Sequence, residues 1–194
     1  MEKSLKVKIK GVAPFISHSG EMANPMNPYS LKMKEFTSKR KKTESDYLKM
    51  SEIEWYGGLY IGEKNDIIIP PHVLQAMIDK AGKSIRLTDK FKQGVYITNP
   101  AKFIHKGPKD IKKLWEDEKF RYIRLVNVKN GSSKVKVLRT RPIFNEWEAE
   151  FEIKYLDSVV DRSDLERAMT HAKDACGLGD ERPRFGRFEI VSMV

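Results

Sequence analysis

Residues 177–188 read Gly-Leu-Gly-Asp-Glu-Arg-Pro-Arg-Phe-Gly-Arg-Phe and directly follow a segment with the periodicity of an amphipathic helix. Ser163 and Glu166 have the spacing of a capping box, so we expect the helix to begin there. Gly177 can adopt the left-handed backbone conformation that commonly ends a helix, so we expect the helix to end there. Apolar residues at helical spacing form one stripe, which we interpret as core rather than as a site: Leu165, Ala168, Met169, Ala172 and Cys176.

The glycines of residues 177–188 permit a close approach of the backbone to a ligand or to a neighbouring subunit, and the arginines carry guanidinium groups that match phosphate. A final strand that starts at Phe185 would turn Phe185 and Arg187 outward and Phe188 toward the core. An ordinary helix-to-strand turn, with its arginines solvated or paired with Asp180 and Glu181, explains the same residues equally well. The candidate binding residues of this loop are Gly177, Gly179, Arg182, Arg184, Phe185, Gly186 and Arg187.

Two segments of the sequence resemble the RAMP superfamily, the ferredoxin-like RNA-binding proteins that form the backbone of CRISPR effector complexes. Helix, Gly-x-Gly and Arg-x-Arg-Phe-Gly-Arg-Phe before a last strand resemble the C-terminal glycine-rich loop of that superfamily. Residues 68–77 resemble its strand-Pro-helix segment, although Pro71 and His72 replace a Gly-Ser pair and Gln75 replaces a Lys. The resemblance implies RNA binding and assembly of subunits along the ligand, as a homo-oligomer or filament.

The order of expected elements agrees with that fold. Leu5, Val7 and Ile9 alternate with lysines in a first strand that has one buried face. Residues 55–69 suggest a hairpin, which Pro70-Pro71 ends before a helix. We therefore predict an α+β fold with a ferredoxin-like or RRM-like βαββαβ core, an antiparallel sheet and two helices on one face. We expect residues 1–194 to form a single RAMP-like domain with a long basic insertion at residues 18–54.

That insertion contains the densest basic run of the chain, Lys39, Arg40, Lys41 and Lys42. Basic residues interleaved with Phe36 and Tyr47 are what a single strand of nucleic acid needs, because charge contacts the backbone and rings stack on bases. A solvated charged helix explains the run equally well. A second group of cations, Arg139 and Arg141, lies at the end of the alternating strand at residues 134–140.

Composition narrows the class of function. The chain has 194 residues and a formal net charge of +10, which favours a polyanionic partner, although solubility alone can explain such a charge. One cysteine excludes disulfides, and no long apolar run or signal-peptide core indicates a membrane, so we expect a cytoplasmic protein. The four histidines show no metal-ligand spacing, and we expect neither metal nor cofactor.

We therefore predict a sequence-tolerant protein that binds single-stranded RNA or DNA and is not an enzyme. The exception is RNA cleavage by an Asp after the first strand, as in some RAMP subunits, for which this insertion offers Asp46. Residues 37–43 and 139–144 also resemble proteins carried by tailed phages, which would place the chain in a bacterial host cell. The alternative function is accordingly that of a phage interaction or anti-defence protein that binds a host protein or sequesters a nucleotide messenger.

Overall fold

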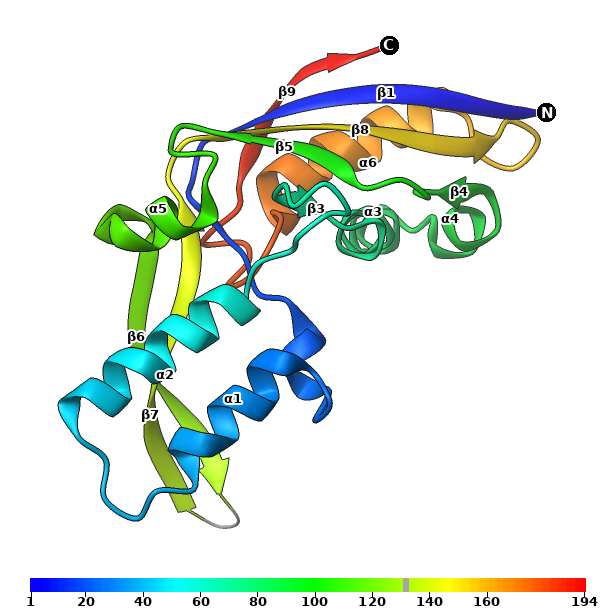
Figure 1. Cartoon of the computed structure of the whole chain (residues 1–194). Helices are drawn as coiled ribbons and strands as arrows, with labels where there is room; N and C mark the ends of the chain where they lie inside the picture. Colours follow the sequence, from blue (N-terminus) through cyan, green and yellow to red (C-terminus); the bar gives the residue numbers. More distant parts are fainter. Residues whose placement is uncertain (131–132) are drawn as a thin grey trace. The chain divides into compact units, whose positions relative to one another are not determined.

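The structure is a computed structural model that describes residues 1–130 and 133–194 (Figure 1). The chain divides into two compact units. Unit 1 comprises residues 1–15, 60–106 and 144–194, and unit 2 comprises residues 16–59 and 107–143.

Unit 1 is built on an antiparallel sheet with the strand order β3-β5-β8-β1-β9, and β4 also pairs with β8. Strands that pair with one another in this sheet are separated along the chain by helices or by a long segment, so their register comes from the side-chain pattern rather than from short turns. The strands are β1 (Glu2–Gly11), β3 (Ile68–Ile69), β4 (Val95–Tyr96), β5 (Ala101–His105), β8 (Trp147–Leu156) and β9 (Phe188–Met193).

Two helices, α3 (Pro71–Ser84) and α6 (Arg162–His171), lie side by side against one face of this sheet (Figure 1). Leu5 lies opposite Ile153 and Val7 opposite Phe151, and all four side chains are buried. The helices bury their own apolar stripes against that face, including Leu74 and Met77 of α3 and Leu165 and Met169 of α6. A short helix, α4 (Thr88–Gly94), connects α3 to β4.

The path β1-α3-β5-β8-α6-β9 is a βαββαβ unit, and its strands lie in the order β9-β1-β8-β5. This is the ferredoxin-like arrangement, so the predicted fold class is confirmed. The alternation of β1 and the helical stripe of residues 165–176 indicated it correctly, because both patterns report burial on one side.

Unit 2 combines a helical pair with a β-hairpin. Its elements are η1 (Gly20–Ala23), α1 (Pro28–Thr37), α2 (Glu44–Gly57), α5 (Ile111–Glu116), η2 (Glu118–Phe120), β6 (Arg121–Asn130) and β7 (Ser133–Phe144). The short strand β2 (Phe15–Ile16) adds to β7, in the order β2-β7-β6. Trp55 is fully buried, donates its indole N–H to the carbonyl oxygen of Phe120 at 2.7 Å and lies 5.6 Å from the ring of Trp115. Trp55 thereby links α2 to the segment that leads into β6.

Several expected details differ in the structure. The hairpin predicted at residues 55–69 is wrong in its first part, because α2 extends to Gly57; a shorter pairing remains, in which an antiparallel bridge joins Ile61 to Ile67 and Ile68 N–H donates to Tyr60 O at 3.0 Å. The predicted capping box is wrong as well, because α6 begins one residue before Ser163, with Asp161 as its N-cap, and Glu166 instead accepts a hydrogen bond from Arg162 at 2.9 Å. The apolar stripe continues past α6 as a π-helical turn, η3 (Ala172–Cys176).

The prediction of a single domain with an insertion at residues 18–54 stays a prediction. The structure places that segment in unit 2, where it forms α1 and α2, together with a second segment, residues 107–143. This second segment separates β5 from β8. The sequence pattern did not separate it from the core, because its hairpin strands alternate in the same way as sheet strands do.

Candidate functional site

The positive charge of the chain is concentrated in unit 2. Unit 2 contains 18 Lys and Arg residues against 10 Asp and Glu residues, whereas unit 1 contains 19 against 17. The formal net charges are therefore +8 for unit 2 and +2 for unit 1. An anionic partner would meet its strongest attraction at unit 2.

On the open face of the sheet in unit 1, positive and negative side chains lie opposite one another. Lysines of β1 lie opposite glutamates of β8: Lys6 opposite Glu152, Lys8 opposite Glu150 and Lys10 opposite Glu148. Lys8 Nζ lies 3.1 Å from both Glu148 and Glu150, and the pKa of Lys8 is raised by these two carboxylates. The exposed lysines of β1 therefore stabilise strand pairing rather than form a positive surface.

The basic run at residues 39–42 connects α1 to α2, and its four cations have different surroundings. Lys39 Nζ contacts Asp46 and lies 5.1 Å from the ring of Phe36. Lys42 Nζ donates to the carbonyl oxygens of Thr37 and Lys39, at 3.2 Å and 2.9 Å, and so closes the end of α1. Arg40 and Lys41 are both exposed. These two are the members of the run that we expect to be open to a ligand.

Asp46, the residue considered for RNA cleavage, caps helix α2. One carboxylate oxygen accepts from the backbone N–H and hydroxyl of Thr43, at 2.9 Å and 3.0 Å, and the other accepts from Lys39 at 2.5 Å. The hydrogen bond from Lys39, followed by that from the Thr43 backbone, lowers the pKa of Asp46 to about 2. The capping box of the chain thus lies at Thr43 and Asp46.

The hairpin of β6 and β7 carries cations and exposed apolar side chains together. Leu125 pairs with Leu138 and Val128 with Val135, and these four side chains are 36–60% exposed. Cations lie on the same two strands, at Arg124, Lys129, Lys134, Lys136, Arg139 and Arg141. In Figure 1 the outer ends of β6 and β7 and the connection between α1 and α2 lie toward the same end of unit 2.

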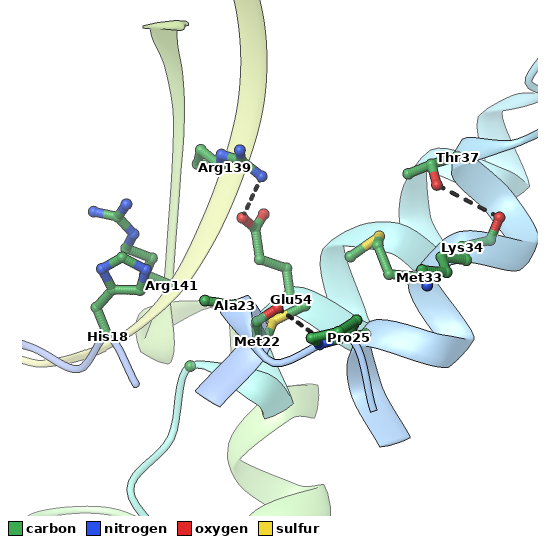
Figure 2. Close-up of a pocket in the computed structure, with 12 residues that line it drawn as sticks. His18, Met22, Ala23, Pro25, Met33, Lys34, Thr37, Glu54, Arg139 and Arg141 are labelled. Atoms are coloured by element: carbon green, nitrogen blue, oxygen red, sulfur yellow. Dashed lines mark hydrogen bonds and ion pairs between the residues drawn. The ribbon is translucent and has the colours of Figure 1, made fainter. Parts of the chain in front are cut away.

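Arg139 and Arg141, the second group of cations named from the sequence, line a pocket of about 490 Å³ within unit 2. Figure 2 shows His18, Arg139 and Arg141 on one side of this pocket and Met33 with Pro25 on the other. The complete lining is His18, Met22, Ala23, Pro25, Ser30, Met33, Lys34, Thr37, Glu54, Gly58, Arg139 and Arg141.

Glu54 fixes the position of Arg139 in the pocket. One oxygen of its carboxylate accepts from the Arg139 guanidinium at 2.9 Å, and the other accepts from the backbone N–H of Thr140 at 2.8 Å. Both contacts join α2 to β7. Because Glu54 is the only carboxylate of the described lining, against Lys34, Arg139 and Arg141, the pocket keeps a net positive charge.

The glycines of the loop at residues 177–186 bring its own backbone together. Gly177, Gly179 and Gly186 all have positive φ, of 66°, 80° and 69°. Leu178 N–H donates to Gly186 O at 2.9 Å, and a Cβ at Gly186 would lie 1.6 Å from Leu178 O. Gly186 N–H also donates to the carbonyl of Pro14 at 2.8 Å. This close approach explains Gly186, and a Cβ at Gly177 would likewise lie 2.9 Å from Phe185 O.

The charged part of that loop lies on the surface of unit 1. Arg182, Arg184 and Arg187 are exposed, and the Arg184 guanidinium lies 5.7 Å from the centre of the Phe185 ring. Phe188 is buried, as predicted, and Phe185 is half-buried in the turn, because β9 begins at Phe188 rather than at Phe185. The role of these residues in binding stays a prediction.

Among residues 1–130 and 133–194, no three His, Cys, Asp or Glu side chains gather in a way that could hold a metal ion. Within the same ranges, no helix has the length and apolarity needed to span a membrane.

Sequence reasoning missed the pocket and most of the hairpin cations. His18, Lys34 and Glu54 are distant in sequence from Arg139 and carry no motif that joins them. The alternation of lysine and valine at residues 134–137 was a usable signal for the hairpin. It predicted a strand but not that both of its faces would be exposed.

The fold is similar to that of a chain in a solved structure. A chain in the cryo-EM structure of the Type III-B Cmr-beta bound to cognate target RNA superposes with a TM-score of 0.55 at 12% identity, and the alignment covers 100% of this chain. This chain spans 60% of the length of that one. Cmr6 from Pyrococcus furiosus aligns with a TM-score of 0.44 at 11% identity, over 97% of this chain and 98% of Cmr6.

No protein-family model and no curated protein matches the sequence. The ferredoxin-like fold that the resemblance at residues 68–77 and 177–188 implied is thus confirmed by the first of the two structures. The similarity to phage proteins finds no support in these comparisons.

Proposed function

We propose that this protein binds a single strand of nucleic acid, RNA in the first place, along the basic surface of unit 2 and without reading base sequence. The observation that carries the proposal is the net charge of +8 on unit 2 against +2 on unit 1. A polyanion gains most where cations gather, because each phosphate contact releases condensed counterions.

The hairpin of β6 and β7 supplies the second element of such a surface. Its exposed leucines and valines offer apolar contact to bases, and the lysines beside them contact the phosphate backbone. These contacts do not read base edges, so they favour tolerance of sequence. The similar fold in a complex that is bound to target RNA makes RNA the first ligand to test.

The test is a comparison of two triple variants that lose the same charge. Lys129→Ala/Lys134→Ala/Lys136→Ala removes cations from the hairpin, and Lys64→Ala/Lys83→Ala/Lys92→Ala removes exposed lysines from unit 1. Fluorescence anisotropy with single-stranded RNA of increasing length and at several salt concentrations measures both variants. We expect only the hairpin variant to weaken binding and to reduce the salt slope by about 0.7 for each phosphate that it no longer neutralises.

An equal loss in both variants would show that net charge, rather than unit 2, attracts RNA. RNA that fails to bind the unaltered protein at low salt would contradict the proposal itself. Single-stranded DNA of the same length tests the choice of RNA, and assembly of several copies along one strand stays a further prediction.

A further inference from the structure

The pocket of unit 2 has the two-sided character of a site for an amphiphilic anion. Its volume of about 490 Å³ falls within the usual range of small-molecule sites. Met22, Ala23 and Met33 contribute thioether and methyl groups to the lining, and Arg139 and Arg141 contribute cationic groups; Figure 2 shows Met33 on the far side of Glu54 from the two arginines. A ligand that fills both sides needs an apolar body and a negatively charged end.

The cationic side is built to hold a phosphate in a defined position. Glu54 orients Arg139 through a 2.9 Å contact and is itself held by the backbone of Thr140. Arg139 and Arg141 are two positions apart on β7 and therefore project from the same face of the strand. Two guanidinium groups on one face match the oxygens of a phosphate, and His18 lies beside them in the lining.

The opposite side is suited to a flat ring. Methionine side chains are polarizable and adapt to the face or edge of an aromatic system. Met22 comes from η1 and Met33 from α1, so two elements contribute to this wall. The hydroxyls of Ser30 and Thr37, also in the lining, donate to the carbonyl oxygens of Met22 and Lys34, at 2.7 Å and 3.4 Å, and keep lone pairs that can accept a hydrogen bond from a ligand.

We infer that this pocket binds one nucleoside monophosphate, with the base against Met22 and Met33 and the phosphate at Arg139 and Arg141. The nucleotide is either free or one unit of a bound strand, and both present the same base and phosphate. The inference rests on the proposed function where the nucleotide belongs to a strand, and it stands independently where the nucleotide is free.

The methionine methyl groups report directly on the pocket. In protein labelled with ¹³C at the methionine methyls, adenosine and uridine monophosphate are titrated, with the unphosphorylated nucleosides and inorganic phosphate as controls. We expect the resonances of Met22 and Met33 to shift with the monophosphates, while Met77 and Met169, buried in unit 1, keep their positions. The controls should shift them less, because each offers only one half of the ligand.

A matched pair of variants tests the position. Met33→Trp fills the pocket, whereas Leu31→Trp adds the same side chain to an exposed position of α1 outside the lining. We expect Met33→Trp alone to abolish the shift of the Met22 resonance and to weaken RNA binding about ten-fold if the pocket takes a nucleotide of the strand. Monophosphate binding that disappears while RNA binding is unchanged would assign the pocket to free nucleotides.

The two proposals fail in different ways. RNA that binds unit 2 while neither RNA nor the monophosphates shift Met22 and Met33 would overturn the pocket and leave the proposed function intact. Monophosphates that shift these methyl resonances in a protein that binds no RNA would overturn the proposed function and leave the pocket inference intact.

Discussion

Lys39 Nζ lies 2.5 Å from Asp46 Oδ1 and ties the connection between α1 and α2 to the first turn of α2. Part of the basic run at residues 39–42 therefore stabilises the fold and is not available to a ligand. Asp46 is held ionised, with its pKa lowered to about 2, chiefly by Lys39 and then by the backbone N–H of Thr43. The same carboxylate accepts a hydrogen bond from the hydroxyl of Thr43.

This contact predicts an acid-sensitive contribution to stability. The pKa of Asp46 is depressed in the folded protein, whereas an aspartate of the unfolded chain titrates at about 3.9. Its contribution is therefore present above about pH 4 and is lost as the pH falls toward about 2. We expect the difference in urea midpoint between the protein and Asp46→Asn to be constant at neutral pH and to shrink across that window. Asp89→Asn, an exposed position of α4, is the control; a difference independent of pH would contradict the prediction.

The four cations of the basic run should act as two pairs, one that binds RNA and one that stabilises the fold. Arg40→Ala/Lys41→Ala should weaken RNA binding and lower the salt slope by about 0.7 for each phosphate left unbound, with an unchanged melting temperature, because both side chains are exposed. Lys39→Ala/Lys42→Ala should lower the melting temperature, because these two hold Asp46 and the end of α1. Differential scanning fluorimetry and anisotropy on both variants measure the two effects. A lower melting temperature for the first pair would refute this division.

Phe188 and Phe185 should behave differently when truncated. Phe188 is 1% exposed, so Phe188→Ala should lower the free energy of unfolding by about 3–5 kcal/mol. Phe185→Ala, in the half-buried turn beside Arg184, should cost less stability and should weaken RNA binding by about 1–3 kcal/mol if this loop contacts bases. Urea denaturation and anisotropy compare the two. Equal binding by the protein and Phe185→Ala would restrict RNA to unit 2.

A side chain at Gly186 should not be tolerated. Its φ is +69° and a Cβ would lie 1.6 Å from Leu178 O, so Gly186→Ala combines backbone strain of about 1–3 kcal/mol with a clash against backbone. Gly20→Ala is the matched control, because a Cβ there meets nothing within 4 Å. We expect the first variant to lower the melting temperature by several degrees or to prevent folding, and the second to leave it nearly unchanged. A Gly186→Ala protein of native melting temperature would show that the loop can open without cost.

Local patterns in the sequence were sufficient for the first strand and the C-terminal helix of unit 1, but not for β5. The alternation of Leu5, Val7 and Ile9 and the stripe from Leu165 to Cys176 each report which side of one element is buried. Such patterns repeat within a few residues, so they can be recognised in the sequence without knowing which distant residues are in contact. The order of these elements then limited the core to the βαββαβ arrangement that the structure has.

Only the tertiary structure decided which charges are available to a ligand and where a pocket forms. Lys39 is occupied because α2 places Asp46 beside it, and Lys8 is compensated because strand pairing places Glu148 and Glu150 beside it. The pocket exists because α2 meets β7 through Glu54 and Arg139, 85 residues apart in sequence. Contacts over such separations depend on how elements pack, and no local periodicity encodes that packing.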